Sequence, residues 1–306
     1  MQTVHADYKK VNTAGGTAVA IGNFDGLHKG HQKLLTILKE KAKELSVPSV
    51  VYTFSDHPKN VMLGEGAQKL ISPNEIKERL FAEMGIHTLF FEDFNAVRDL
   101  EPEEFVKEIL IDKLNIKVAV IGTNGRFGKK SAGDASMLKE FGKRYGFEVL
   151  VVEPMVIDDV VCSSTEVRTA IEAGDFVKCE SLLGRPYSVS GTVIADKHLG
   201  RTYGYPTANL IPDGARPDIK RGVYATVTKI DDKAYKSITN VGTTSFDKIE
   251  KSRIETHILD FSGDLYGKTI EVEFLYYMRR FKSFVSTDEL KSQLDKDKKE
   301  RKLGGN

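Results

Sequence analysis

The sequence predicts a Rossmann-like α/β domain with a doubly wound parallel sheet, followed by a small antiparallel β-barrel with a C-terminal helix. Three observations predict this. Short apolar runs alternate with amphipathic helical stretches in the first half, as in parallel sheets covered on both faces. In the second half, strand-like segments follow one another without helices, which favours a barrel. The rhythm changes at Gly184-Arg185-Pro186, so we expect domains at residues 1–184 and 185–306.

The first half supplies the parallel strands and their covering helices. Residues 33–45 place Leu34, Leu35 and Leu38 on one helical face, and a second helix is expected to start at Pro73. Two short helices are expected at residues 164–173 and 175–183. The predicted strands are residues 18–21, 49–54, 89–91, 118–121 and 149–152.

The second half supplies the barrel. Its β-rich segments are separated by Gly and Asp turns, and several alternate with period two. A final helix is expected over residues 286–302, with Leu290 and Leu294 on its apolar face. The predicted strands are residues 188–195, 223–230, 254–261 and 269–277.

Composition excludes several classes of protein. The chain of 306 residues has a formal net charge of +1, which argues against a nucleic-acid-binding protein. Cys162 and Cys179 form no C-x-x-C pair and have no zinc-ligand spacing, which favours a reducing compartment. No apolar run approaches the roughly 20 residues of a membrane span, and residues 1–10 lack a signal-peptide core. We expect a cytoplasmic protein with no membrane partner, present as a monomer or a weak homo-oligomer.

The segment GNFDGLHKGH at residues 22–31 follows a predicted strand and leads into a helix. Ligands of open parallel sheets bind at this end of the strands, and a helix N-terminus there suits phosphate. Glycines allow close approach of backbone and ligand, and His28 and His31 can donate hydrogen bonds to phosphoryl oxygens. A glycine-rich turn with two incidental histidines is the alternative. Zinc is excluded because no third ligand lies nearby.

This segment closely resembles the opening signature of the bacterial bifunctional riboflavin kinase/FAD synthetases, whose N-terminal module is an H-x-G-H nucleotidyltransferase. The resemblance implies that His28 and His31 contact the phosphates of ATP. It also implies a phosphate-binding role for the surrounding residues, namely Gly22, Asn23, Phe24, Asp25, Gly26 and Gly30.

The segment CSSTEVR at residues 162–168 resembles the second signature of the nucleotidyltransferases. The resemblance implies that Ser163, Ser164 and Thr165 bind the triphosphate and that Arg168 clamps it. Taken alone, a Ser-Ser-Thr run before a helix is simply a good N-cap.

Two further segments of the first half resemble the family: TFSDHP at residues 53–58 is similar to its flavin-site segment, and GTNGRFG at residues 122–128 resembles another segment, near the expected flavin and adenine positions. The chain has Asp56 where the family usually has proline, Thr123 where an acidic residue is common, and Gly125 where an aromatic residue is common. The flavin-binding residues implied by the resemblance are Phe54, His57, Pro58, Asn124, Phe127 and, in the second half, Arg279.

The barrel has no P-loop, since the nearest string, GDLYGKT at residues 263–269, is one residue short and is better interpreted as a hairpin turn. The segment GRTYGYPTAN at residues 200–209 resembles the flavokinase signature. Gly200 and Pro206 are implied in ATP binding, and Thr207 and Asn209 supply oxygens suited to Mg²⁺. Without the resemblance, this segment is an ordinary turn.

The segment ETHILDF at residues 255–261 resembles the part of the family that bears the catalytic base. The resemblance implies that Glu255 takes the proton from the flavin 5′-hydroxyl, which is a weak nucleophile without such help. Two departures accompany it: residues 240–246 lack the usual proline, with Thr244 in that loop, and Phe281 stands where an acidic residue is usual.

The resemblance implies an enzyme that phosphorylates riboflavin to FMN and then adenylylates FMN to FAD with release of pyrophosphate. It uses Mg²⁺ with ATP, and FMN and FAD are substrate and product rather than prosthetic groups. Two alternatives stay open. One is an FMN adenylyltransferase whose kinase barrel is weakened, and the other is a non-catalytic flavin-binding regulator.

Overall fold

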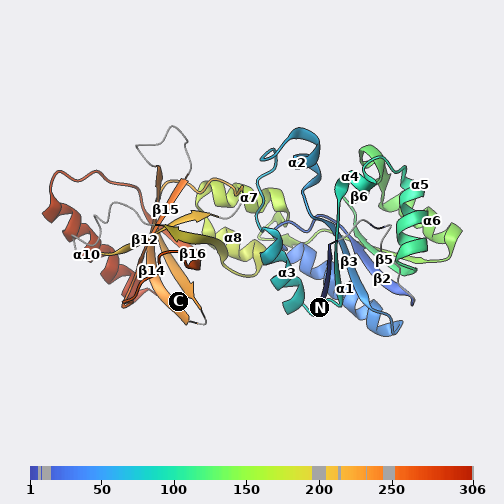
Figure 1. Ribbon diagram of the computed structural model, residues 1–306, viewed down its shortest axis with the longest axis horizontal. Helices are drawn as coiled ribbons and strands as arrows, with labels where there is room; N and C mark the ends of the chain where they lie inside the picture. The colour runs from blue at the N-terminus through green and yellow to red at the C-terminus, as the bar shows by residue number, and fades with distance from the viewer. Residues whose placement is uncertain are drawn as a thin grey trace. The chain divides into compact units, whose positions relative to one another are not determined.

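A computed structural model describes the chain except for residues 6–7, 9–14, 195–204, 213–214, 232, 244–251 and 305–306. The chain forms two compact units, Met1–Ser164 and Thr165–Asn306, and many of their elements are labelled in Figure 1. This division falls after the first residue of α7 (Ser164–Ala173) and before α8 (Phe176–Leu183), whereas the sequence places the domain boundary after both helices.

The first unit is built on a six-stranded sheet in the order β1-β4-β3-β2-β5-β8, with every neighbouring pair parallel. β2 pairs with β3 on one side and with β5 on the other, so the chain order reverses there, and ligands bind beside such reversals. The strands are β1 (Gln2–His5), β2 (Thr17–Ile21), β3 (Ser49–Phe54), β4 (Thr88–Glu92), β5 (Ile116–Gly122) and β8 (Glu148–Val152).

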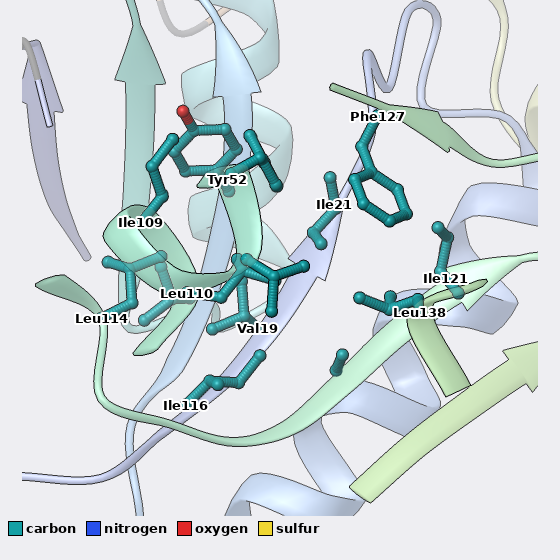
Figure 2. Close-up of a cluster of buried hydrophobic side chains, with 14 of the residues drawn as sticks. Val19, Ile21, Tyr52, Ile109, Leu110, Leu114, Ile116, Ile121, Phe127 and Leu138 are labelled. Carbon is teal, nitrogen blue, oxygen red and sulfur yellow. The ribbon is translucent and has the colours of Figure 1, made fainter. Parts of the chain in front are cut away.

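Helices cover both faces of this sheet. Val19 and Ile21 point to a core that includes Ile109, Leu110 and Leu138, as Figure 2 shows. Their neighbours along β2 point to the other face, against residues of α1 and α3. Alternate residues of one strand therefore face opposite layers, as expected for a buried parallel strand.

The helical segments of the first unit are α1 (Lys29–Glu44), α2 (Pro58–Leu63), α3 (Asn74–Glu83), α4 (Phe94–Val97), α5 (Pro102–Glu104), a π-helix (Phe105–Lys113), a short 3₁₀ turn (Lys129–Ser131) and α6 (Ala135–Tyr145). Two small hairpins complete it: β6 (Arg126–Phe127) with β7 (Gly133–Asp134), and β9 (Val156–Ile157) with β10 (Val160–Val161).

The second unit is a closed antiparallel barrel in the order β11-β12-β15-β14-β13-β16, in which β16 returns to pair with β11. The predicted barrel is confirmed. Its elements are β11 (Tyr187–Ile194), β12 (Thr207–Pro212), β13 (Gly222–Ile230), β14 (Lys233–Thr243), β15 (Ser252–Ile258), β16 (Thr269–Arg279) and the C-terminal helix α10 (Thr287–Leu303).

The inner face of the barrel is partly polar. Thr226 contacts Ser237 and Thr239 at 2.8 Å, and Thr239 contacts Thr256 at the same distance. All four side chains are buried, and because hydroxyls both donate and accept, they satisfy one another there. Because hydroxyl side chains occupy inward positions that are usually apolar, these strands lack the apolar alternation by which a strand is normally recognised in a sequence.

Among the described strands of the six-stranded sheet and the barrel, β1, β12 and β14 were not expected from the sequence, and neither were the short hairpin strands β6, β7, β9 and β10. The residues from 240 that we expected to form a loop belong, up to Thr243, to β14. β15 ends at Ile258 rather than at residue 261, because Asp260 has a left-handed backbone with φ of 56°. In the parts of the chain that the structure describes, every helix is too short or too polar to cross a membrane.

Candidate active sites

The loop after β2 is held by two apolar anchors. Phe24 and Leu27 have positive φ angles of 48° and 42°, and their side chains are only 2% and 1% exposed. Gly26 also has a positive φ, 79°, and a Cβ there would lie 3.0 Å from Ile71. The loop is thus fixed by burial, with its backbone at the carboxyl end of the central strand, where phosphate is expected.

Asp25 serves this loop as an anchor. Its carboxylate accepts hydrogen bonds from the backbone N–H of Ile71 at 3.0 Å and of Ser72 at 3.2 Å. The Ser164 hydroxyl donates to the carbonyl of Asp25 at 2.8 Å, and that of Thr53 donates to the carbonyl of Asn23 at 3.3 Å. Ser164 of the second signature is thereby joined to the first signature. A direct phosphate contact by Asp25 stays a prediction.

His28 and His31 stack at the start of α1, with ring centroids 3.6 Å apart and planes inclined by 20°. His28 is the N-cap of α1, and its Nδ1 accepts from the backbone N–H of His31 at 3.3 Å. In the neutral ring the proton of His28 therefore lies on Nε2. Gly30 makes room for this pair, because a Cβ there would lie 3.1 Å from the His28 ring and 3.4 Å from the carbonyl of Cys162.

His31 is poised to donate as a neutral ring. Burial, followed by the nearby charges of His28 and Lys77, holds its pKa well below the usual range of histidine. Its Nδ1 is buried and has no hydrogen-bond partner in the described part of the chain. A ligand with phosphoryl oxygens would supply such a partner, which agrees with the predicted role of the histidine pair.

Lys77 of α3 is a charged residue of this site that the sequence did not reveal. Its side chain is buried, and burial lowers its pKa while the carboxylates of Asp25 and Asp56 oppose that shift. Asp56, which stands where the family usually has proline, is thus, after Asp25, the second carboxylate whose charge favours the protonated form of Lys77. Lys77 lies on an ordinary amphipathic helix, so only the tertiary structure distinguishes it.

Cys162 borders the histidine pair, with Sγ 3.6 Å from Nδ1 of His28. Burial raises the pKa of its thiol, which disfavours a thiolate beside the histidine. Ser163 follows it, while Thr165 and Arg168 belong to the second unit, on α7. The phosphate contacts of Ser163, Thr165 and Arg168 stay predictions.

The predicted flavin residues of the first unit occupy different surroundings. Phe54 ends β3 and packs edge-on against Tyr52 and Phe94. His57 caps α2 by accepting from the backbone N–H of Lys59 at 3.2 Å, and Pro58 occupies the first turn of that helix.

The other two predicted flavin residues follow β5. Asn124 is exposed beyond the end of that strand, whereas Phe127 is 5% exposed and belongs to the hydrophobic core in Figure 2. Gly125 is required between them, because a Cβ there would lie 2.3 Å from Cγ1 of Ile121. The aromatic residue common in the family at this position therefore does not fit this turn. Flavin contacts by all of these residues stay predictions.

In the barrel, the strand register brings the predicted kinase residues together. Asn209 of β12 lies directly opposite Glu255 of β15, and Thr207 lies directly opposite His257. On its other side, Glu255 is opposite Asn240 of β14. Directly opposed residues of antiparallel strands place their side chains on the same face, so Asn209, Glu255 and Asn240 form one polar row.

His257 holds the strand that carries the predicted magnesium ligands. Its Nδ1 is 2.9 Å from the carbonyl oxygen of Pro206, and burial lowers the pKa of its ring. The hydroxyl of Tyr205 donates to Asp295 of α10 at 2.5 Å, and burial followed by this bond raises the Tyr205 pKa to about 12. Pro206 and Thr207 line a cavity of about 300 Å³ that is also lined by Phe261 and Tyr266.

Arg279 has a structural partner. Its Nε and Nη2 donate to the carboxylate of Asp297 at 2.9 and 2.7 Å, which joins β16 to α10. Phe281, where the family usually has an acidic residue, is 62% exposed. Flavin binding by Arg279 stays a prediction, and Gly200 and Thr244 lie outside the described residues.

Comparisons with known proteins agree with one candidate site in each half of the chain. A family model described as FAD synthetase matches residues 10–166, and one described as riboflavin kinase matches residues 183–303. The bifunctional riboflavin kinase/FMN adenylyltransferase of Escherichia coli strain K12 is 34% identical over 92% of this chain and 90% of the relative. The protein of the same description from Haemophilus influenzae is 33% identical over 97% of both chains.

A solved structure is also similar. A Streptococcus pneumoniae chain, whose crystal structure is described as a macrolide-efflux protein, matches over 100% of both chains with a TM-score of 0.92 and 31% identity. An efflux role is a description of that protein alone. Because the two family models match in succession and relatives above 30% identity cover nine-tenths of the sequence, the chain belongs to the bifunctional riboflavin kinase/FAD synthetase family.

Proposed function

We infer that this chain phosphorylates riboflavin to FMN in its barrel and adenylylates FMN to FAD in its α/β unit, with ATP as the donor in both reactions. The two family matches and the names of the relatives support both activities. The observation that carries the assignment to residues is the register of the barrel, which places Glu255 directly opposite Asn209.

In the kinase reaction, Glu255 accepts the proton of the riboflavin 5′-hydroxyl as the hydroxyl oxygen bonds to the γ-phosphorus of ATP and ADP leaves. A positioned carboxylate contributes about 10²–10⁴-fold to such a step. Thr207 and Asn209 hold the phosphates on the neighbouring strand, and the contact from His257 to the carbonyl of Pro206 fixes the start of that strand.

The donor set of the barrel fits Mg²⁺, which prefers oxygen ligands. Thr207 and Asn209 are two positions apart on β12, so their hydroxyl and amide groups share a face with Glu255. We propose that these two residues hold the ion. When bound, Mg²⁺ neutralises phosphate charge. The protein contributes the oxygen ligands and their spacing.

In the adenylyltransferase reaction, the FMN phosphate attacks the α-phosphorus of a second ATP and pyrophosphate leaves. This nucleophile is already anionic, so no general base is required. Catalysis consists of positioning and of hydrogen-bond donation to the phosphates by His28 and His31, with Arg168 as a clamp. The neutral state of His31 and its unpartnered Nδ1 support this role.

The two alternatives are less favoured. A weakened barrel or a non-catalytic regulator predicts loss of the groups that carry the chemistry. The chain instead retains Glu255 opposite Asn209, and the His28–His31 stack is intact at the start of α1.

We further propose that the enzyme works in the cytoplasm as a monomer or weak homo-oligomer, with small-molecule partners and no nucleic acid. The near-neutral charge supports this. Both cysteines, which the structure describes, are buried and form no disulfide, as in reduced proteins.

The test is one incubation of the full chain with riboflavin, ATP and Mg²⁺, with chromatographic separation of riboflavin, FMN and FAD over time. We expect FMN to appear first and FAD to follow, with ADP and pyrophosphate as co-products. FAD formed only from supplied FMN would indicate a weakened barrel, and no product from either flavin would indicate a regulator.

A further inference from the structure

Asn240 is a polar residue of the barrel that carries an unexplained buried atom. Its Oδ1 is inaccessible to solvent and has no hydrogen-bond partner among the residues that the structure describes. Leaving a buried acceptor unsatisfied typically costs about 1–3 kcal/mol, and native proteins rarely do so without a reason. A ligand that brings a hydrogen-bonding group to this position would remove that cost.

The neighbours of Asn240 limit what this ligand can be. On one side it lies directly opposite Val223, which belongs to a small apolar cluster with Ile238 and Leu259. On the other side it lies directly opposite Glu255. The side chain of Val223, the described residue that lies directly opposite on this side, offers no polar group, so we look for the group that satisfies the amide on the side of the proposed base.

The spacing matches a substrate with hydroxyl groups on adjacent carbons. Opposed residues in an antiparallel pair have Cβ atoms about 4.5–5.5 Å apart, so one substrate oxygen can lie at each side chain. A hydroxyl both donates and accepts, so it can bond to either end of an amide. The ribityl chain of riboflavin carries such hydroxyls next to the one that reacts.

We propose that Asn240 binds the ribityl 4′-hydroxyl of riboflavin and thereby positions the 5′-hydroxyl at Glu255. This proposal rests on the proposed function, in which Glu255 is the base of the kinase reaction. Asn240 forms no covalent bond and transfers no proton. It selects a polyol chain over a shorter or less hydroxylated one, which makes it a specificity-determining residue of the barrel.

The experiment combines one variant with one substrate analogue. Asn240→Leu keeps the size of the side chain and removes its hydrogen-bonding groups, and 4′-deoxyriboflavin lacks the hydroxyl in question. We expect each change alone to lower kcat/KM for the flavin by about 10- to 100-fold. The kcat/KM of the variant should be nearly the same for the analogue as for riboflavin, because the contact that the analogue lacks is already absent from the variant. The KM for ATP should stay within about 2-fold of the wild-type value.

Three controls keep the result interpretable. Val223→Ala alters packing on the other side of Asn240 but leaves the proposed contact in place. Its effect on kcat/KM should therefore multiply with the effect of 4′-deoxyriboflavin, as independent effects do. Adenylylation of supplied FMN by each preparation reports the integrity of the first unit, and thermal unfolding reports that of the barrel. If Asn240→Leu fails to fold, Asn240→Ala, which also removes the amide, carries the same comparison.

The proposal would be overturned if the loss of kcat/KM caused by Asn240→Leu and the loss caused by 4′-deoxyriboflavin multiplied when combined. It would also be overturned if Asn240→Leu needed more Mg²⁺ while discriminating against the analogue as strongly as the wild type does. The failure of the underlying function is distinguishable. If Glu255→Gln phosphorylates riboflavin at the wild-type rate, the whole site is wrongly placed. If Glu255→Gln is inactive but the losses at Asn240 multiply, only the role of Asn240 is wrong.

Discussion

At the scale of single residues, the main feature is the pair of stacked imidazoles at the start of α1. Their centroids are 3.6 Å apart, and two protonated rings at that distance would repel each other. The buried Lys77 adds a third positive group nearby. The site therefore favours a neutral ring at His31, which can donate through a single N–H to the proposed phosphate ligand.

The suppressed protonation of His31 predicts a pH dependence of stability. Its pKa is lowered in the folded state, whereas an unfolded histidine titrates near pH ~6.5. Its contribution is therefore complete above about pH 6.5 and is lost as pH falls, by at most about 1.4 kcal/mol per pH unit. We expect His31→Gln, which cannot be protonated, to lose less unfolding free energy than the wild type between pH 7.5 and 5. Urea titrations across this range measure the difference, and parallel curves for the two proteins would contradict the assignment.

Residues of the site differ in how far the sequence could reveal them. His28, His31 and Glu255 stand in contiguous motifs, so their chemistry could be predicted before their geometry was known. Lys77 and Asn240 could not be found in that way. Lys77 acquires its role because the fold buries it near Asp25, and Asn240 acquires its role from a strand register that no local pattern specifies.

At the scale of elements, α10 is joined to the barrel by two guanidinium groups, one half-buried on β16 and one fully buried on α10 itself. Arg279 binds Asp297 through two nitrogens, and Arg301, which is completely buried, donates to the backbone oxygens of Thr226 and Ser237. Paired charge inside a protein is costly to break, because the remaining partner is left uncompensated.

This attachment gives a matched pair of variants. Asp297→Ala leaves the guanidinium of Arg279 without its buried partner, and we expect it to lower the unfolding free energy of the barrel by about 3 kcal/mol. Lys302 lies on the same helix and forms an exposed ion pair with Asp260, so Lys302→Ala should change the unfolding free energy little. Denaturant titration followed by far-UV circular dichroism measures both. Equal destabilisation by the two variants would show that α10 is not held by Arg279.

Most elements could be predicted because their apolar patterns are strong, and the missed ones have a physical reason. β14 places Ser237 and Thr239 on the inner face, where hydroxyl contacts replace apolar packing, so its periodicity is hidden. β12 contains Asn209 and Pro212, which are residue types typical of turns, so its sequence alone does not indicate a strand. β1 is a four-residue strand at the edge of the sheet, too short for a recognisable apolar pattern.

At the scale of the whole molecule, α8 belongs energetically with the barrel. Phe176 is completely buried, and its ring contacts those of Tyr187, Tyr224 and Phe274 at centroid distances of 5.8, 5.3 and 4.7 Å. We therefore expect a fragment of residues 165–306 to be more stable than one of residues 185–306, which lacks this aromatic contact. Thermal unfolding of the two fragments decides this. Equal stability would place the boundary at residue 184, where the sequence changes from alternating strands and helices to successive strands.

The central claim is that two reactions are performed by different residues in different units, and product analysis of two variants tests it most directly. His31→Ala removes a donor to the ATP phosphates, which typically costs about 10²–10³ in rate, so riboflavin should accumulate as FMN. Glu255→Gln removes the base and should lose about 10²–10⁴ of the kinase rate, while supplied FMN still becomes FAD. Loss of both activities in either folded variant, or unchanged phosphorylation in Glu255→Gln, would contradict the account.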